Sequence, residues 1–249
     1  MGLFFDEEQQ EKYNKLSRKF HEILIGPDGE KGRQYFKSRN VSDDLLEKFM
    51  LGYCPENVKL SEKFSYLSGR IVCPIIDELG NTIAFSGRKI DSKDWFHDTF
   101  QKSFFLYGLN VAWKNILKTN SIIIVEGQFD VLSMWKHGFT NTVGVLGGVL
   151  AEEGIIKLAR FTNRFITIFD GDLAGICAAS RVMDFLKDYE SSGYEHLNVC
   201  LRIDQKEYDP DEFLEKYGTS GMISFIKKAS DNKREKRKSK KIEDLINVD

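Results

Sequence analysis

The sequence is poor in the residues that build metal clusters and disulfide frameworks. It has 249 residues but only four cysteines and four histidines. The cysteines are scattered, with no CxxC pair and no histidine nearby at zinc-finger spacing: Cys54, Cys73, Cys177 and Cys200. This pattern argues against a structural zinc site, so no zinc is expected in this chain, and buried free thiols are the better interpretation.

Long apolar runs are also missing. No stretch approaches the roughly 20 apolar residues that a helix needs to cross a bilayer. The acidic start, MGLFFDEEQQ, lacks the features of a signal peptide. We therefore expect no membrane partner and a cytoplasmic protein, or one of the host cytoplasm if a phage or plasmid encodes it.

A strong overall charge is absent as well. The formal net charge is -2, which argues against a protein that coats nucleic acid but allows a local basic groove. Charge does gather between Lys227 and Lys241, where nine lysines and arginines stand against two acids, Asp231 and Glu235. Such a run is either a solvated helix or tail, or a contact for phosphate or for a partner.

The composition that remains is that of a soluble globular protein, with 41% hydrophobic and 30% charged residues. Residues 70–77 and 81–90 are typical of a β-hairpin that follows helical segments. After about residue 118, four short apolar runs alternate with helical patterns: 122–125, 142–146, 164–169 and 197–203. Alternation of this kind predicts an α/β fold with a parallel, doubly wound sheet, preceded by a smaller mixed α+β part.

Carboxylates follow three of the four predicted strands. They are Glu126 and Asp130 after the first, Asp170 and Asp172 after the third, and Asp209 and Asp211 after the fourth. In a parallel sheet the carboxyl ends of all strands lie at one edge, so these acids can converge. Two carboxylates about 4 Å apart repel by roughly 4 kcal/mol at an effective dielectric constant of 20, which a cation would offset. Oxygen ligands of this kind suit Mg²⁺ or Mn²⁺.

Each acidic motif taken alone has a simpler interpretation. An Asp-Pro-Asp is usually a helix cap with a first-turn acid, and a DGD is often a turn. The joint placement of all three motifs at strand ends favours a site. Two divalent ions there would stabilise the attacking and leaving oxygens of phosphoryl or nucleotidyl transfer.

The same motifs make the chain recognisable. EGQFDV at 126–131, DGDLAG at 170–175 and DPDEFL at 209–214 resemble the Toprim domain that bacterial-type primases, topoisomerases and some nucleases share. Upstream, YFKSRNVSDDLLEKFMLGYCP at 35–55 resembles the opening of the RNA polymerase domain of DnaG-type primases. RIVCPIID, FSGRKI and QKSFFLYGLN resemble basic motifs of that family in order and spacing. The resemblance covers about residues 30–225.

This resemblance implies a DNA primase, which makes RNA primers on single-stranded DNA from ribonucleoside triphosphates by two-metal nucleotidyl transfer. It implies catalytic and metal-binding roles for Glu126, Asp170 and Asp172, and supporting metal-binding roles for Asp130, Asp209 and Asp211. Glu126 is either a ligand or a proton acceptor. The resemblance further implies that the nucleotide and the template are bound by Arg70, Arg88 and Lys102.

The implied organisation has four parts. They are an N-terminal α+β subdomain at 1–118, the Toprim domain at 119–206, a C-terminal helical part at 207–230 and a basic tail at 231–249. The family's zinc ribbon and helicase-binding domain are not found in the sequence. We therefore expect an excised catalytic core or a compact stand-alone form, with a replicative helicase or a separate zinc-binding module as partner.

One motif departs from the family. Where relatives carry a Lys-Tyr-Leu-Asn-like stretch, this chain has DWFH at 94–97, and Lys93 is only an approximate substitute for the lysine. Two other functions use the same acids or the same fold: a Toprim-type metal-dependent nuclease, and a non-catalytic nucleic-acid or helicase-binding replication accessory. The basic upstream part argues against the nuclease, and the intact acids argue against the accessory. A topoisomerase would need a tyrosine-bearing domain for which the chain has no room.

Overall fold

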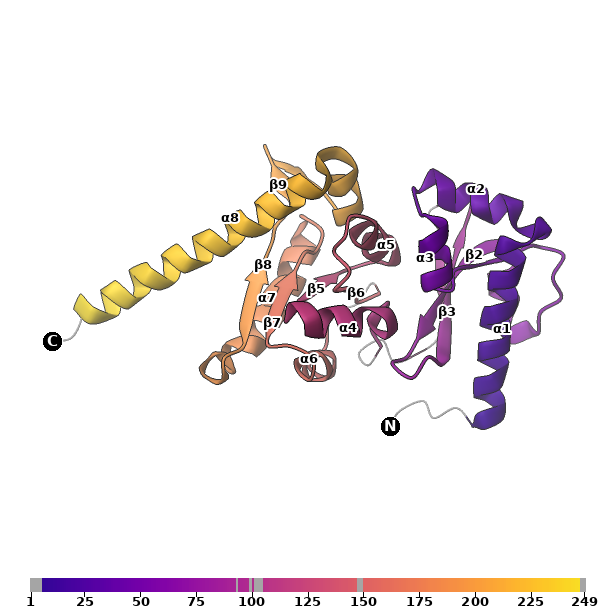
Figure 1. The fold of residues 1–249 in the computed structure, drawn as a ribbon, viewed down its shortest axis with the longest axis horizontal. Helices are drawn as coiled ribbons and strands as arrows, with labels where there is room; N and C mark the ends of the chain where they lie inside the picture. The colour runs from indigo at the N-terminus through magenta and orange to yellow at the C-terminus, as the bar shows by residue number, and fades with distance from the viewer. Residues whose placement is uncertain (1–5, 93, 99, 101–104, 147–149, 247–249) are drawn as a thin grey trace.

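The structure is a computed structural model that describes residues 6–246, except 93, 99, 101–104 and 147–149. The chain forms two sheets with their helices, and a long C-terminal helix that projects from the body (Figure 1). None of the described helices combines the length and the apolar character that crossing a membrane requires.

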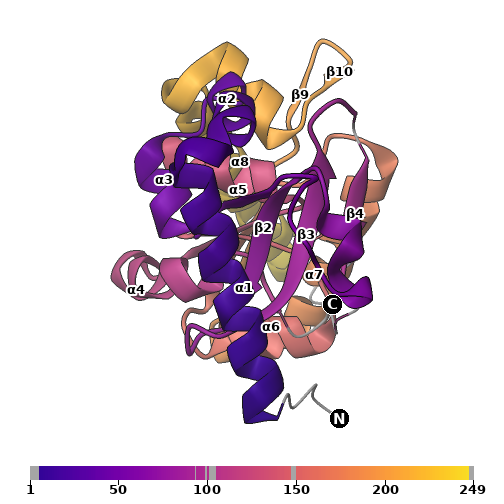
Figure 2. The same cartoon turned by 90° about the vertical axis from the view of Figure 1, so that its right-hand side faces the viewer.

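The N-terminal part is an antiparallel sheet covered by helices. Its strands follow the order β1-β2-β3-β4. Their bounds are β1 Gly52–Cys54, β2 Arg70–Ile76, β3 Thr82–Lys89 and β4 Trp95–His97. Its helices are α1 Glu7–Ile25, η1 Pro27–Gly29, α2 Glu30–Ser38, α3 Asp43–Lys48 and η2 Glu62–Leu67. Helix α1 lies across the outer face of this sheet (Figure 2), and the predicted hairpin is confirmed as β2 and β3.

The second part is a parallel sheet flanked by helices, as predicted. Its strand order, β6-β5-β7-β8, places β5 and β7 side by side at the centre. The strands are β5 Ile122–Val125, β6 Thr142–Gly144, β7 Arg164–Thr167 and β8 Glu195–Asn198. The helices are α4 Leu109–Thr119, α5 Gln128–Lys136, α6 Glu152–Ala159, α7 Leu173–Lys187 and η3 Glu190–Ser192. The four apolar residues of β5 are all buried, because helices cover the sheet on both faces.

One expectation about the C-terminal part is wrong in detail. The predicted strand at 197–203 is two strands: β8 ends at Asn198, and β9 (Arg202–Ile203) pairs with β10 (Lys206–Glu207) in a separate hairpin. The predicted tail at 231–249 is helical as far as residue 246, since α8 runs from Pro210 to Ile246. The basic run is therefore helical where the structure describes it, and the choice between a solvated segment and a contact for phosphate or a partner stays open.

The expectation of buried thiols holds for only part of the set. Cys54 and Cys73 are buried, whereas Cys177 and Cys200 are exposed, and all four are free. Burial raises the pKa of the Cys54 thiol to about 11, so this thiol stays protonated at neutral pH.

One hydrophobic core joins the two sheets. It contains Phe36 from α2, Ile71 from β2, Ile124 from β5 and Phe213 from α8, all of them fully buried. The rings of Phe49 and Trp135, one from each part, meet edge to face at 5.2 Å. This shared core fixes the antiparallel sheet against the helices that follow β5, and so determines what faces the acidic motifs.

Candidate active site

Glu126 and Asp170 lie side by side because their strands do. Glu126 comes directly after β5, and the chain leaves β7 through Ile168, whose N–H donates to the carbonyl of Ile124 at 2.9 Å. Two residues later, the backbone N–H of Asp170 donates to Glu126 Oε1 at 3.2 Å. The pairing of two parallel strands thus brings residues 44 positions apart into contact.

Asp172 lies at the start of α7 and is exposed. Its Oδ1 accepts the N–H of Gly175 at 2.8 Å, so it caps the helix. A Cβ on Gly175 would lie 2.2 Å from the carbonyl oxygen of Asp170, so only glycine allows this tight passage from loop to helix. The DGDLAG motif is therefore both a helix start and a holder of two carboxylates.

Asp130 belongs to the first turn of α5. Its Oδ2 accepts the N–H of Gly127 at 2.8 Å. Burial, together with the nearby carboxylates of Asp209 and Asp170, raises the pKa of Asp130 to about 8. This residue therefore faces the other acids, as the sequence predicts.

The third acidic pair lies at the start of α8. Asp209 Oδ1 accepts the N–H of Glu212 at 2.6 Å, and burial raises the pKa of Asp209. Asp211 Oδ2 accepts a hydrogen bond from Arg39 Nη2 at 2.6 Å. Asp209 is thus part of the acidic edge, whereas Asp211 is neutralised by a cation from the N-terminal part.

Asp170 is surrounded by other carboxylates, and one of its oxygen atoms accepts no hydrogen bond from the part of the chain that the structure describes. Burial, with Glu126 and Asp209 as the nearest charges, raises its pKa to about 7. Its Oδ1 is buried and has no hydrogen-bond partner among the described residues. A buried acceptor without a donor costs about 1–3 kcal/mol, which marks a position where a ligand is expected.

The acids lie along one edge of the sheet, but their carboxylates do not converge on a single position. Within the described part of the chain, no three histidine, cysteine, aspartate or glutamate side chains have an arrangement that could hold a metal ion. Burial raises the pKa of Glu126, and the carboxylate of Asp172 adds to the effect. Ionised carboxylates this close repel one another, so drawing them together requires a cation.

Arg88 leads from β3 into a ring of aromatic side chains beside this edge. Its guanidinium lies 5.6 Å from the ring centre of Trp95, 5.5 Å from that of Phe129 and 6.0 Å from that of Tyr35. Its Nε is buried without a hydrogen-bond partner among the described residues. Since Phe129 directly precedes Asp130, the Arg88 guanidinium lies against the helix that carries one of the acids.

Arg70 is placed differently from what the resemblance implies. It begins β2 with only 9% of its side chain exposed, and it bonds to Asp94 through both terminal nitrogens. The guanidinium is therefore used inside the antiparallel sheet, and its nucleotide-binding role stays a prediction. Lys102, with the neighbouring Lys93, lies outside the described residues.

Arg39 is the residue that sequence reasoning missed. Its guanidinium lies 4.9 Å from the ring centre of Phe129 and bonds to Asp211, so it joins α2, α5 and α8. In the sequence it is a single basic residue at the end of a short helix. Because its partner is 172 positions away, no local pattern could indicate the contact.

Two family models match the chain. The model described as Toprim domain matches residues 120–194, and the model described as DNA primase catalytic core, N-terminal domain, matches residues 58–113. The DNA primase of Lactococcus lactis is 30% identical over 247 residues, which cover 86% of this chain. The DNA primase of Chlamydia pneumoniae is 33% identical over 82% of this chain. The chain belongs to the family of DnaG-type primase catalytic cores.

Solved structures agree with the membership. The E. coli primase catalytic core is 25% identical, with a TM-score of 0.77 over 88% of this chain and 80% of that one. A DnaG primase catalytic domain bound to ssDNA is 23% identical, with a TM-score of 0.77, over 89% of this chain and 80% of that one, and is similar in fold. This DnaG-type core spans 38% of the length of the Lactococcus relative and 39% of the Chlamydia relative.

Proposed function

We propose that this DnaG-type core synthesises RNA primers on a single-stranded DNA template from ribonucleoside triphosphates. The observation that carries the proposal is the buried, partnerless Oδ1 of Asp170 within an edge of carboxylates. Beside that edge, the guanidinium of Arg88 contacts the ring of Phe129, the residue that precedes Asp130. Nucleotidyl transfer requires carboxylates that bind a divalent cation and a positive side chain that binds phosphate, and this site offers both.

The residues fit a hard divalent cation. All of the donors are carboxylate oxygens, as Mg²⁺ and Mn²⁺ prefer, and neither histidine nor cysteine is among them. Glu126, Asp170 and Asp172 would hold the ion or ions, with Asp130, Asp209 and Asp211 in support. Once bound, such a cation neutralises the charge that develops on phosphate oxygens.

The protein's own groups would position the reactants. Arg88 is suited to hold a triphosphate or template phosphate, because a guanidinium can donate two parallel hydrogen bonds. Arg39 holds Asp211 and stacks on Phe129, and so fixes the helix that bears Asp130. The Oε1 atom of Glu126 is engaged by the Asp170 N–H, which leaves Oε2 to ligate the cation or to accept the proton of the attacking hydroxyl.

Partners and boundaries form part of the same proposal. We expect the template and the triphosphates to approach the acidic edge from the side of Arg88. A separate zinc-binding module would help to select the start site on the template, and a replicative helicase would bring the protein to the single-stranded DNA. The functional parts would be 1–118, 119–206, 207–230 and 231–249, and the protein would act in the cytoplasm or in the cytoplasm of a host cell.

Labelled ribonucleotides, single-stranded DNA and either Mg²⁺ or Mn²⁺ provide the test. The chain is expected to give short RNA products. Asp170→Asn with Asp172→Asn should lower the yield at least about a hundredfold, because the ion would lose its ligands. Asp184→Asn, an exposed acid on α7 outside the site, serves as the matched control with unchanged yield.

Other outcomes would change the assignment. Cleavage of the DNA without RNA synthesis would make the chain a nuclease, and binding without either activity would make it an accessory. Full synthesis by the doubly substituted variant would remove the acids from the reaction. Circular dichroism of each variant checks that the fold is intact.

A further inference from the structure

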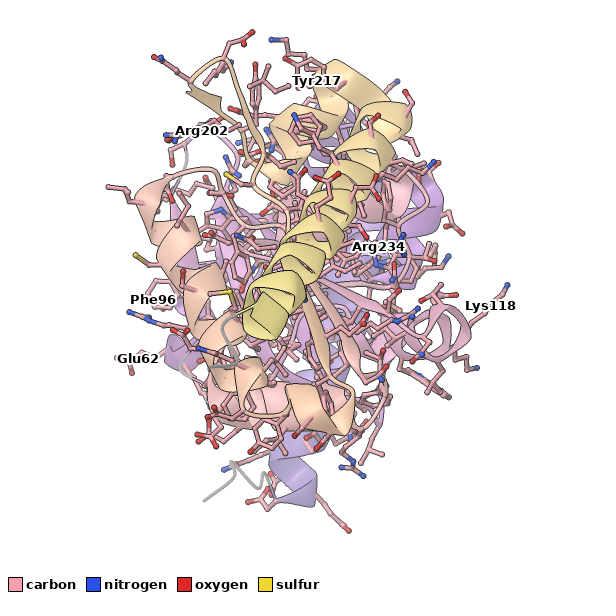
Figure 3. The ribbon with its side chains drawn as sticks, turned by 90° about the vertical axis from the view of Figure 1, so that its left-hand side faces the viewer. Glu62, Phe96, Lys118, Arg202, Tyr217 and Arg234 are labelled. Carbon is pink, nitrogen blue, oxygen red and sulfur yellow. The ribbon has the colours of Figure 1, made fainter. Side chains whose placement is uncertain are left out.

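A groove beside the edge strand β8 is lined by none of the six acids of the proposed site. It lies between α7, the edge strand β8 and the projecting half of α8, with a volume of about 490 Å³. Figure 3 views the molecule from the side toward which α8 projects, with Arg202, one of the lining residues, labelled. A volume of this size is typical of ligand and peptide sites.

The floor of the groove is apolar, and it is largely aliphatic. Met183 and Leu186 come from α7, Leu197 and Val199 from β8 and the residues after it, and Phe225 from α8. Met183 has 49% of its surface exposed, although methionine usually contributes to cores. Met183, Leu197 and Phe225 would gain free energy if an apolar group covered them, whereas Leu186 and Val199 are already buried.

The rim is basic. Four of the residues that line the groove are cations, namely Lys187, Arg202, Lys228 and Lys233, and none of the lining residues is an acid. The overall charge of the chain is -2, so this one-sided lining differs strongly from the average surface. Arg202 pairs with the carboxylate of Glu207 beside the groove, and Lys233 donates to the backbone carbonyl of His196, so Lys187 and Lys228 contribute most to the attraction of an anionic occupant.

The shape of α8 produces this arrangement. Phe225, Lys228, Ala229, Asn232 and Lys233 all line the groove. These five positions recur at spacings of three and four, which place them on one face of a helix. The Nζ of Lys233 donates to the backbone carbonyl of His196 on β8, so the helix is fastened to the free edge of the sheet. Contacts of α8 with β8 therefore shape the groove, together with Val199 and Cys200 from the segment that follows β8.

We propose that this groove binds an acidic segment of a partner protein, in which carboxylates flank one or two large apolar side chains. Charge complementarity supports an anionic partner. The floor favours protein over nucleic acid, because aliphatic side chains offer no ring on which a base can stack. The rings that line the groove are those of Phe225 and of His196, which is 8% exposed. A segment with apolar anchors among acids uses both the floor and the rim.

The probe is a short fluorescein-labelled peptide in which phenylalanine and leucine are set among aspartates and glutamates. Fluorescence anisotropy with the full chain is expected to show saturable binding. Lys187→Glu with Lys228→Glu should weaken it at least about tenfold, because two attractive contacts become repulsive. Met183→Ser should weaken binding of this peptide but leave unchanged the weak binding of a matched peptide with serine in place of the apolar residues.

The control is Arg234→Glu. Arg234 is exposed, carries the same charge on the same helix, and lies on the side of α8 away from Arg202, outside the groove (Figure 3). Its reversal should change the affinity less than about twofold. An equal loss with Arg234→Glu would reduce the effect to overall charge and would overturn the proposal.

Three further results would also overturn it. They are the absence of saturable peptide binding, equal affinity for the peptide without apolar residues, and preferential binding of oligo-dT that Lys187→Glu with Lys228→Glu abolishes. A dimer that the same double substitution dissociates, seen by light scattering, would make the occupant a second copy of the chain. Primer synthesis is measured in parallel, and it should be unchanged in all of these variants.

Discussion

The guanidinium of Arg70 is bound on two sides by Asp94. Nη2 donates to the carboxylate at 2.7 Å, and Nη1 donates to the backbone carbonyl at 2.9 Å. The arginine side chain is 9% exposed and that of its partner 51%. The DWFH segment thus begins with an acid that forms an ion pair with the first residue of β2.

We predict that Arg70 acts mainly in stability. Arg70→Met should lower the free energy of unfolding by about 1–3 kcal/mol, because two hydrogen bonds to the segment before β4 are lost. The affinity for single-stranded DNA, measured at a temperature where the variant is folded, should stay within about twofold. Urea unfolding and fluorescence anisotropy give the two quantities.

Asp94→Ala provides the matched comparison. It leaves a buried guanidinium without its carboxylate, and it should therefore destabilise the fold more than Arg70→Met does. If Arg70→Met instead abolished DNA binding at full stability, the arginine would belong to the binding groove as the family resemblance implies.

Arg88 is expected to behave in the opposite way. Arg88→Ala should weaken binding of single-stranded DNA about tenfold at low salt, with a smaller loss at high salt, because one phosphate contact disappears. The slope of log affinity against log salt should become shallower by about 0.7. A salt titration by anisotropy measures both effects.

Two variants make the Arg88 result specific. Arg88→Lys keeps the charge and should retain the salt slope, while losing part of the affinity because lysine cannot donate two parallel hydrogen bonds. Arg18→Ala, on α1 and paired with Glu11, is the distant control. A slope unchanged by Arg88→Ala would place this residue outside the phosphate path.

Without a divalent cation, stability should fall as the pH rises from 6.5 to 8. The folded chain keeps a proton on Asp130, whose pKa is raised from 3.8 to about 8, whereas the unfolded chain has released it. The folded state thus binds more protons in this range, and stability decreases by about 2 kcal/mol over it. Thermal melting in EDTA measures the decrease.

His196 has the opposite effect at lower pH. Burial lowers its pKa to about 4, so the unfolded chain binds more protons below about 6.5, and stability falls as the pH drops. Between pH 6.5 and 8, the change in stability therefore reports on the acids and not on His196. Mg²⁺ or Mn²⁺ should raise the melting temperature more at pH 8 than at 6.5, and Asp130→Asn should flatten the decrease. A flat profile for the unsubstituted chain in EDTA would contradict the acidic edge.

Gly218 divides α8 into two helices. Its φ of 63° and ψ of -173° are accessible to glycine and strained for other residues, and a Cβ there would meet no atom within 4 Å. Gly218→Ala should therefore cost about 1–3 kcal/mol through the backbone alone. Ser220→Ala, an exposed neighbour, should change little. Equal urea midpoints for both variants would show that the bend is not strained.

The parts of the fold that depend on local periodicity could be predicted. Strand β5 and helix α1 follow from runs and spacings that a reader can see in the sequence. The hairpin of β9 and β10 could not, because its strands are two residues long and its turn places Asp204 and Gln205 at positive φ. Glycine is the residue that usually indicates such a turn in a sequence, and neither of these two residues is a glycine.

The candidate site divides in the same way. Glu126, Asp130 and Asp170 could be expected at one edge because strand ends in a parallel sheet share it. The aromatic surroundings of Arg88 could not be foreseen, since they combine Tyr35, Trp95 and Phe129 from three distant segments. The ion pair between Arg70 and Asp94 could not be predicted for another reason. In a sequence, nothing distinguishes a carboxylate that binds an arginine from one that is simply exposed to solvent.

The contact between Arg39 and Asp211 also bears on the order in which the chain folds during its synthesis. The two residues are 172 positions apart, so a nascent chain must emerge from the ribosome through the start of α8 before the contact can form. The N-terminal sheet, whose strands are neighbours in the chain, can fold long before that. Completion of the acidic edge is therefore a late event in biogenesis, and a product cut short before residue 209 would carry a folded first sheet without the last pair of acids.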